Sequence, residues 1–258
     1  MAGGDQGATS EEVNRLIAKH ARPGVKFTLE DVRGHRAVAV GLSSRVGVVV
    51  DGEAGDFLAA FNAGAMVVAK GSVGRCLGYG MTAGAVQVVG SAGEGAGAYL
   101  HGGALHIFGD AGAFAGMRMA GGELVVKDNA KEGAGAGMAG GELAVLGAAL
   151  GTVGAGMSGG AIFARAGTTF DSACAHSSKL DPQGAARLKA LAAAVKVAAI
   201  EPSEYVRIAA LAYAGPAPAG EGATAAAHVK VSGAGASPPS PRVTVSKGGA
   251  DPPGGALP

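Results

Sequence analysis

The chain is poor in aromatic side chains and in cysteine. Aromatic residues make up 4% of its 258 residues, and tryptophan is absent. A conventional globular core normally uses more of these large side chains. The two cysteines, Cys76 and Cys174, are not spaced as a pair and cannot by themselves hold an iron–sulfur cluster. These shortages argue against a disulfide scaffold and favour a narrow interior built from small and aliphatic residues.

The chain also lacks a charge imbalance and a long apolar run. Its formal net charge is +1, which gives no reason to expect binding to nucleic acid or to an anionic membrane surface. No uninterrupted apolar stretch is long enough to span a membrane, and the first residues do not resemble a signal peptide. We therefore expect a cytoplasmic protein with two reduced thiols.

Recognisable catalytic motifs are missing as well. We find no nucleophile elbow, Walker loop, zinc-ligand spacing or paired-carboxylate site in a fitting context. The Gly-x-Gly pair at Gly95 and Gly97 is a by-product of the repeat and is not followed by a dinucleotide-binding helix. His101 and His106 lie in different parts of the repeat described below and have no third ligand at its spacing. We predict that no residue of this chain is catalytic, binds a cofactor or binds a metal.

What the chain does have is glycine, 48 residues of it, arranged in a repeat over residues 46–165. One apolar column steps by 19 residues and consists of Met81, Leu100, Met119, Met138 and Met157. Glycines keep the same step three residues before and three residues after each member of this column. A short fixed period with glycine corners and apolar β-formers is the signature of a solenoid.

Each unit of the repeat holds a short apolar run bounded by glycines, and such runs predict β-strands. The runs cover residues 46–50, 66–68, 86–89, 105–108, 124–126, 143–146 and 162–163. Successive parallel strands joined in this way are expected to wind right-handed, with the methionine column pointing inward as a ladder. We predict an all-β fold, a right-handed parallel β-helix of about seven 19-residue coils.

The corners of the coils carry a second signal. After each run comes a Gly-x-x-Gly corner such as Gly71 to Gly74, where glycine is expected to supply positive φ and to let neighbouring coils approach closely. The corner at Asp128 to Lys131 breaks this pattern. Either it contacts a partner, or Asn129 adopts a left-handed turn and the charges are solvated. Glu123 and Glu142, one period apart, should face water or a partner's basic groups.

Four regions follow from these patterns. Residues 1–35 form an N-terminal helix and lead-in, and residues 36–167 form the β-helix, entered through a strand at residues 37–42. Residues 168–214 form a helical cap, whose helices at 183–197 and 202–213 are expected to cover the open end of the rod. Residues 215–258 are rich in Pro, Gly and Ala and are predicted to be a flexible tail.

The first helix should begin with Ser10 as its N-cap and end before Pro23. The first coil carries Phe57 to Asn62 in place of a glycine-rich corner and is bulkier than the later coils. We therefore predict that Phe57, Phe61 and Asn62 face a partner, as does the broken corner from Asp128 to Glu132.

The Gly-x-x-Gly corners, the aliphatic rungs and the Gly-x-x-Met-x-x-Gly run at Gly135 to Gly141 resemble those of the GXGXG family. That family includes the C-terminal β-helix of the glutamate synthase large subunit, free-standing versions of it in split glutamate and N-methylglutamate synthases, and the β-helix subunit of formylmethanofuran dehydrogenases. The resemblance covers residues 36–167. The lead-in from Gly34 to Leu42 is similar to that of the free-standing synthase subunits, whereas the tail from Gly215 has no counterpart.

The resemblance implies a non-catalytic scaffold subunit of an oxidoreductase complex. It implies two partners: a class II glutaminase that releases ammonia, and a synthase subunit that carries FMN and an iron–sulfur cluster. It implies no cofactor on this chain. Two alternatives remain open: the β-helix subunit of a formylmethanofuran dehydrogenase-type complex, and a free-standing solenoid binding module. The scarcity of aromatic residues argues against the last, because aromatic ladders normally serve such binding faces.

Overall fold

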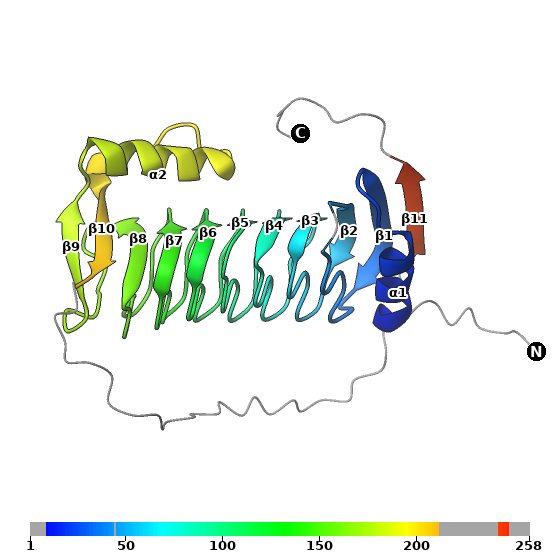
Figure 1. The fold of residues 1–258 in the computed structure, drawn as a ribbon. Coiled ribbons are helices and arrows are strands. Elements are labelled where there is room, and N and C mark those ends of the chain that lie inside the picture. Colours follow the sequence, from blue (N-terminus) through cyan, green and yellow to red (C-terminus); the bar gives the residue numbers. More distant parts are fainter. Residues whose placement is uncertain (1–8, 44, 212–241, 248–258) are drawn as a thin grey trace, which may run out of the picture.

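The computed structural model describes residues 9–43, 45–211 and 242–247. In this part of the chain the fold is a parallel β-helix of about seven coils with two α-helices (Figure 1). The parallel strands follow one another along the rod in sequence order: β1 (Val25–Arg33), β2 (Gly47–Glu53), β3 (Ala63–Ala69), β4 (Ala83–Val88), β5 (Ala104–Ile107), β6 (Ala120–Val126), β7 (Ala139–Val145) and β8 (Gly159–Arg165). The predicted all-β parallel β-helix is confirmed.

The 19-residue period of the sequence is the pairing register of the sheet. One fully buried interior column passes from strand to strand through Val67, Val86, Leu105, Leu124, Leu143 and Ile162. The methionine column lies inside the rod as predicted, with each member at most 3% exposed. Burial of one such side chain contributes about 1.5 to 3 kcal/mol, so the repeated rungs are the main source of stability.

Strands of opposite direction terminate the parallel sheet at both ends. At one end β10 (Tyr205–Ala210) pairs antiparallel with β8, and β9 (Ala175–Lys179) pairs antiparallel with β10. At the other end β11 (Arg242–Lys247) pairs antiparallel with β1. The backbone groups at the outer edges of β1 and β8 are thereby hydrogen-bonded, and the outermost strands of the sheet are β11 and β9.

Helix α1 (Ser10–His20) covers the interior at the β1 end. Its buried residues Val13 and Ile17 belong to the same core cluster as Phe27 of β1. The helix ends before Pro23 as predicted, but its N-cap is Thr9 and not Ser10. Thr9 and Glu12 form a capping box, in which each side chain accepts a hydrogen bond from the backbone N–H of the other residue.

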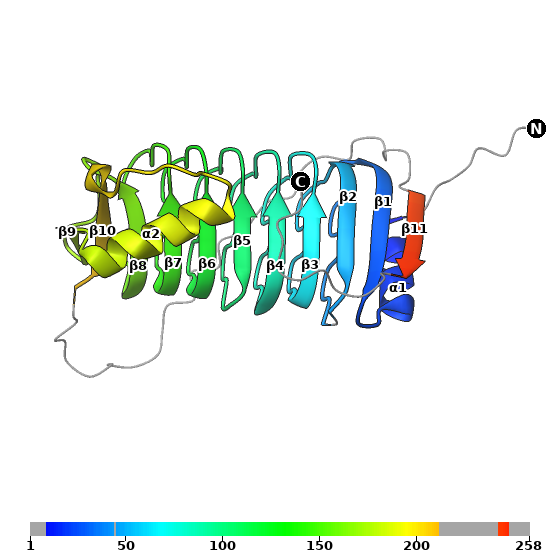
Figure 2. The ribbon, with the colours of Figure 1, turned by 90° about the horizontal axis from the view of Figure 1, so that it is seen from above.

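Helix α2 (Pro182–Ala194) lies along the outer face of the sheet, across β6 to β8, and does not cover the end of the rod (Figures 1 and 2). Its Leu188 and Leu191 form a second core cluster with outward-facing residues of the strands, among them Val125, Ala144 and Phe163. A helix in this part of the chain was predicted correctly, but its predicted position over the end of the rod was wrong. It packs on the sheet instead, because the sheet has an apolar outer face for it to cover.

The second helix expected in the cap is wrong. A single 3₁₀ turn, η1 (Pro202–Glu204), is followed directly by β10. β-branched Val206 and Ile208 suit a strand, and the hydroxyl of Tyr205 donates a hydrogen bond of 2.7 Å to the carbonyl of Leu146. The open edge of β8 needs a hydrogen-bonding partner, and this segment supplies it, so tertiary pairing overrides local helix signals.

Three smaller expectations also change. The strand expected at residues 37–42 is a turn in which Ala37, Ala39 and Gly41 have φ between 54° and 67°. The loop expected after Gly167 contains β9. Within the predicted flexible tail, residues 242–247 form β11, while residues 215–241 and 248–258 lie outside the described part of the chain. Neither described helix is long and apolar enough to cross a membrane.

Candidate interaction surface

Each coil reaches its next strand through a turn in which every second residue has a left-handed backbone conformation. In one of the later coils these residues are Gly133, Gly135 and Gly137, with φ of 77°, 70° and 65°. The same alternation starts at residues 37, 57, 76, 95 and 114. Glycine adopts this conformation at no steric cost, whereas a residue with a Cβ does not. The turns therefore form one face of the rod, which we call the turn face.

Bulky residues occupy several left-handed positions of the earlier coils. Phe57, Phe61, Tyr99, Phe114 and Arg118 all have φ between 54° and 62°. Each costs roughly 1 to 2 kcal/mol relative to an unstrained backbone. The corresponding positions in the coil of Gly133 are glycines, so the repeat could have used glycine throughout.

The bulky residues lie against one another on the turn face. The ring of Tyr79 meets Phe57 at 6.2 Å, Phe61 at 5.6 Å and Tyr99 at 5.2 Å between centroids, and the guanidinium of Arg118 lies 5.9 Å from the Tyr99 centroid. We call these five residues the aromatic stripe. Phe57 is 42% and Phe61 55% exposed. Partial burial raises the pKa of the Tyr79 hydroxyl, which stays neutral.

Charged residues that border the aromatic stripe pair with one another. Arg36 contacts Asp56 at 2.8 Å, and Arg75 contacts Glu94 at 3.5 Å. These four charges cancel, so the border of the stripe is polar but has no net charge. Arg118 has no carboxylate partner among the described residues, and its guanidinium contacts the Tyr99 ring instead. The stripe is thus apolar along most of its length and carries the cation of Arg118 at one end.

The structure brings together two of the three residues predicted at the first coil. Phe57 and Phe61 belong to the stripe, but Asn62 is wrong as a contact residue because it is fully buried. Its side chain donates to the carbonyl of Ala65 at 2.9 Å and accepts from the N–H of Ala65 at 2.9 Å, which shapes the turn.

Sequence reasoning missed Tyr79, Tyr99 and Arg118. Phe61, Tyr99 and Arg118 fall in one column whose members are separated by multiples of 19 residues, so the period that defined the coils contained a signal for two of them. Tyr79 is offset from that column by one residue, and only its ring contacts reveal its place.

The corner at Asp128 keeps the geometry of its neighbours. Ala130 pairs with Ala111 on one side and Ala149 on the other. The side chain of Asn129 accepts a hydrogen bond of 2.9 Å from the N–H of Ala148, and φ of Asn129 is not positive, so the left-handed turn expected there is wrong. In the corners that begin at Gly71, Gly90 and Gly109 no glycine has a positive φ, and glycine is needed there for close approach: a Cβ on Gly71 would lie 2.5 Å from the carbonyl oxygen of Gly52. Gly52 itself has a φ of 110°, so the expected positive φ holds in the first corner.

Glu123 and Glu142 were expected to face water or a partner's basic groups, but Arg187 of α2 binds both. Its Nη2 lies 2.9 Å from Glu123, and its Nε donates to Glu142 at 2.6 Å. His106 donates a further hydrogen bond of 2.9 Å to Glu123. This bond and the contact with Arg187 lower the pKa of the Glu123 carboxyl against the opposing effect of burial. The network fastens α2 to the sheet.

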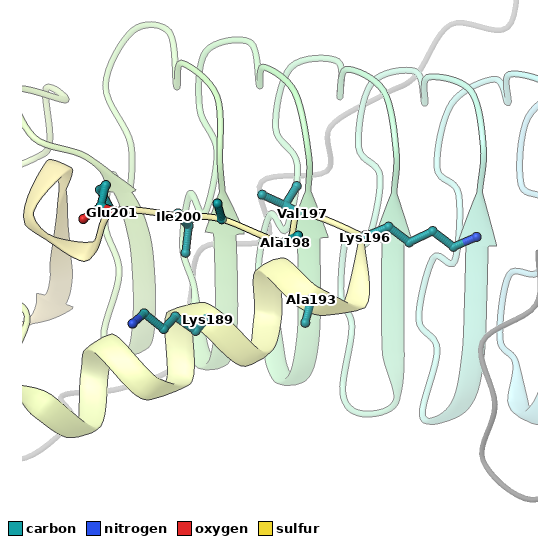
Figure 3. Close-up of a pocket in the computed structure, with 8 residues that line it drawn as sticks. Lys189, Ala193, Lys196, Val197, Ala198, Ile200 and Glu201 are labelled. Carbon is teal, nitrogen blue, oxygen red and sulfur yellow. The ribbon is translucent and has the colours of Figure 1, made fainter.

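Outside the turn face, the other kinds of site open to the described residues are a metal site and a ligand-binding groove. No group of three His, Cys, Asp or Glu side chains in the described part of the chain is arranged to hold a metal ion. A shallow groove runs between α2 and the segment that follows it, lined mainly by small apolar side chains such as Ala193, Val197 and Ile200 (Figure 3). Lys189 and Lys196 extend from it in opposite directions. No reactive groups converge among the residues that line this groove.

Comparison with known proteins adds no relative. No family model matches the chain, and no curated protein matches it significantly.

Proposed function

We propose that this chain is the non-catalytic β-helix subunit of a split glutamate synthase-type complex, in which glutamine supplies nitrogen for glutamate or N-methylglutamate. In this role the rod holds a class II glutaminase subunit against a synthase subunit that carries FMN and an iron–sulfur cluster. The chain itself supplies no cofactor and no catalytic residue. We propose a cytoplasmic location, which agrees with the unbonded state of Cys76 and Cys174.

One observation carries the proposal. A turn with a left-handed residue at every second position, occupied by three glycines from Gly133 to Gly137, recurs at the coil period together with the buried methionine column. The resemblance to the GXGXG family rests on the Gly-x-x-Gly corners, the aliphatic rungs and the glycine–methionine run of the same repeat. A stiff rod with stacked side chains on flat faces is physically suited to hold two other subunits at a fixed distance.

Purification of the chain from its own cells would test the proposal. A mild affinity purification, followed by mass spectrometry of the associated proteins and a visible absorption spectrum, is expected to give a glutaminase-like protein and the spectrum of a flavin with an iron–sulfur cluster. The separated chain is expected to be colourless and free of FMN and metal.

Other outcomes would contradict the proposal. A pterin–metal protein together with a zinc amidohydrolase would identify a formylmethanofuran dehydrogenase-type complex. Stoichiometric FMN or metal on the isolated chain would exclude the scaffold role. A chain that purifies alone would favour a free-standing binding module, for which the five aromatic side chains on the turn face are the specific structural reason.

A further inference from the structure

We propose that the aromatic stripe is the docking surface for one of the partner subunits, and that the partner presents an apolar patch with a single carboxylate at the Arg118 end. This inference rests on the proposed function, because it takes the occupant to be a different protein subunit. It adds which face of the rod the partner binds and what chemistry that partner must offer.

The first argument is the backbone. Phe57, Phe61, Tyr99 and Arg118 are held in left-handed conformations, although glycine occupies the equivalent positions elsewhere in the repeat. A Cβ added at Gly80 would lie 2.9 Å from the ring of Phe61, so that ring covers the neighbouring coil. This contact offsets part of the strain, but more than half of Phe61 still faces solvent. Backbone strain of this kind clusters at ligand-binding and partner-binding sites, and here it is combined with an exposed aromatic side chain.

The second argument is composition. The chain holds seven phenylalanines and four tyrosines, and five of these eleven, including Phe114, lie on the turn face of four consecutive coils. Aromatic residues and arginine, surrounded by a polar border, are what the energetically dominant centre of a protein interface contains. The border of the stripe, Arg36 with Asp56 and Arg75 with Glu94, fits this description.

The third argument is charge, and it selects the occupant. The border charges cancel, so the stripe attracts neither nucleic acid nor an anionic lipid surface. Arg118 is the exception, a cation with no carboxylate beside it in the described part of the chain. An arginine at the edge of an apolar surface binds best to a carboxylate, often with two parallel hydrogen bonds. The complementary surface is therefore apolar, with one acidic group.

The test uses a double variant, Phe61→Gly with Arg118→Gly, in the full chain. Both substitutions install the residue that the repeat uses at Gly137, so the fold is expected to survive, as thermal unfolding would show. The matched control is Met66→Ala, which removes a 52% exposed apolar side chain from the outer face of the sheet. Tagged chains are purified from their own cells, and the recovered partner subunits are quantified per chain.

We expect recovery of one partner to fall on the order of tenfold or more in the double variant and to stay unchanged in Met66→Ala. Hydroxyl-radical labelling of Tyr79 and Tyr99 is expected to be suppressed in the assembled complex relative to the separated chain. Full recovery of the partners, with these tyrosines equally accessible in both states, would overturn the docking surface.

The outcomes also separate this inference from the function it rests on. Glutaminase and flavin subunits that bind the double variant normally would keep the proposed function and remove the docking surface. Partners of another kind that still depend on the stripe would do the reverse. A homodimer that dissociates in the double variant would show that a second copy of the chain occupies the stripe, and a monomer with no partner would overturn both.

Discussion

The two halves of the rod share one interior and present different exteriors. From the coil of Phe57 to that of Arg118 the turn face carries aromatic side chains and arginine, whereas the left-handed positions of the coil of Gly133 are all glycine and carry no side chain. On the outer face of the sheet the second half is the one that carries an additional feature, and the first half is bare. There α2 covers β6 to β8, while Met66 in the first half is 52% exposed. The comparison shows that a repeat can fix the interior and leave each exterior face free to specialise.

Replacement of a closely packed glycine should destabilise both halves of the rod to a similar extent. A Cβ on Gly84 would lie 2.4 Å from the carbonyl oxygen of Ala65, and a Cβ on Gly141 would lie 2.8 Å from the backbone carbon of Gly121. We expect Gly84→Ala and Gly141→Ala each to lower the free energy of unfolding by about 3 kcal/mol or more, as measured by denaturant titration.

Gly156→Ala is the matched control for these substitutions. Its φ is 66°, but a Cβ there would meet nothing within 4 Å, so only the backbone strain remains, about 1 kcal/mol. Equal losses at Gly156 and Gly141 would mean that close approach between coils is not what demands glycine.

The helix-covered half should depend on Arg187. Arg187→Met leaves Glu123 and Glu142 without their shared cation, and these carboxylates are only 24% and 31% exposed. We expect a loss of roughly 1 to 3 kcal/mol, discounted for the partial exposure of the pair. Hydrogen exchange should show the loss as faster opening of α2.

Lys189→Met on the same helix serves as the control, because Lys189 is exposed and outside this network. A similar loss in both variants would refute the view that the ion pairs hold α2 on the sheet.

The aromatic half should show its strain in a comparison of Phe61→Ala with Phe61→Gly. Both variants lose the ring contact with Tyr79, but only glycine also relieves the left-handed backbone at φ of 56°. We expect the glycine variant to be more stable than the alanine variant by about 1 kcal/mol in thermal or denaturant unfolding. The opposite order would show that the position is not strained.

The smallest expected effect is on pH dependence. The pKa of Glu123 is lowered from its ordinary value of 4.5, chiefly by the hydrogen bond from His106. A carboxyl with a lowered pKa in the folded state stabilises the fold above the unfolded pKa, and this stability is lost as the pH falls through the folded pKa. The free energy of unfolding, measured from about pH 6 down to about pH 3, should therefore fall more steeply in the wild type than in Glu123→Gln. Parallel curves would contradict the assignment.

The interior was predictable from the sequence because its residues repeat in register. The turn at residues 37–42 was not. Its alternation of Ala and Val has the period of a strand, but a turn with a left-handed residue at every second position also alternates, and Val38 points inward from it. β10 was hidden because Pro202 resembles a helix start, whereas the pairing demand of β8 comes from a distant part of the sequence.

The candidate surface and the α2 contacts also include one part that the sequence predicts and one part that it does not. Phe57 and Phe61 stood out because they replace glycine within the repeat. The bond between Arg187 and Glu123 joins residues 64 positions apart, and no spacing in the sequence indicates it.

The antiparallel strands at the two ends have a consequence for length. Strand β10 at one end and β11 at the other run against the direction of the coils, so the parallel ladder stops where they pair. Away from α2 each coil contacts mainly its neighbours, so one 19-residue unit between β3 and β5 could be deleted without altering either end. Such a deletion would shorten the rod by about 4.8 Å, the spacing of adjacent strands. The number of coils therefore sets the length of the rod. If two molecules bound to its two halves, the distance between them would change only in steps of one coil.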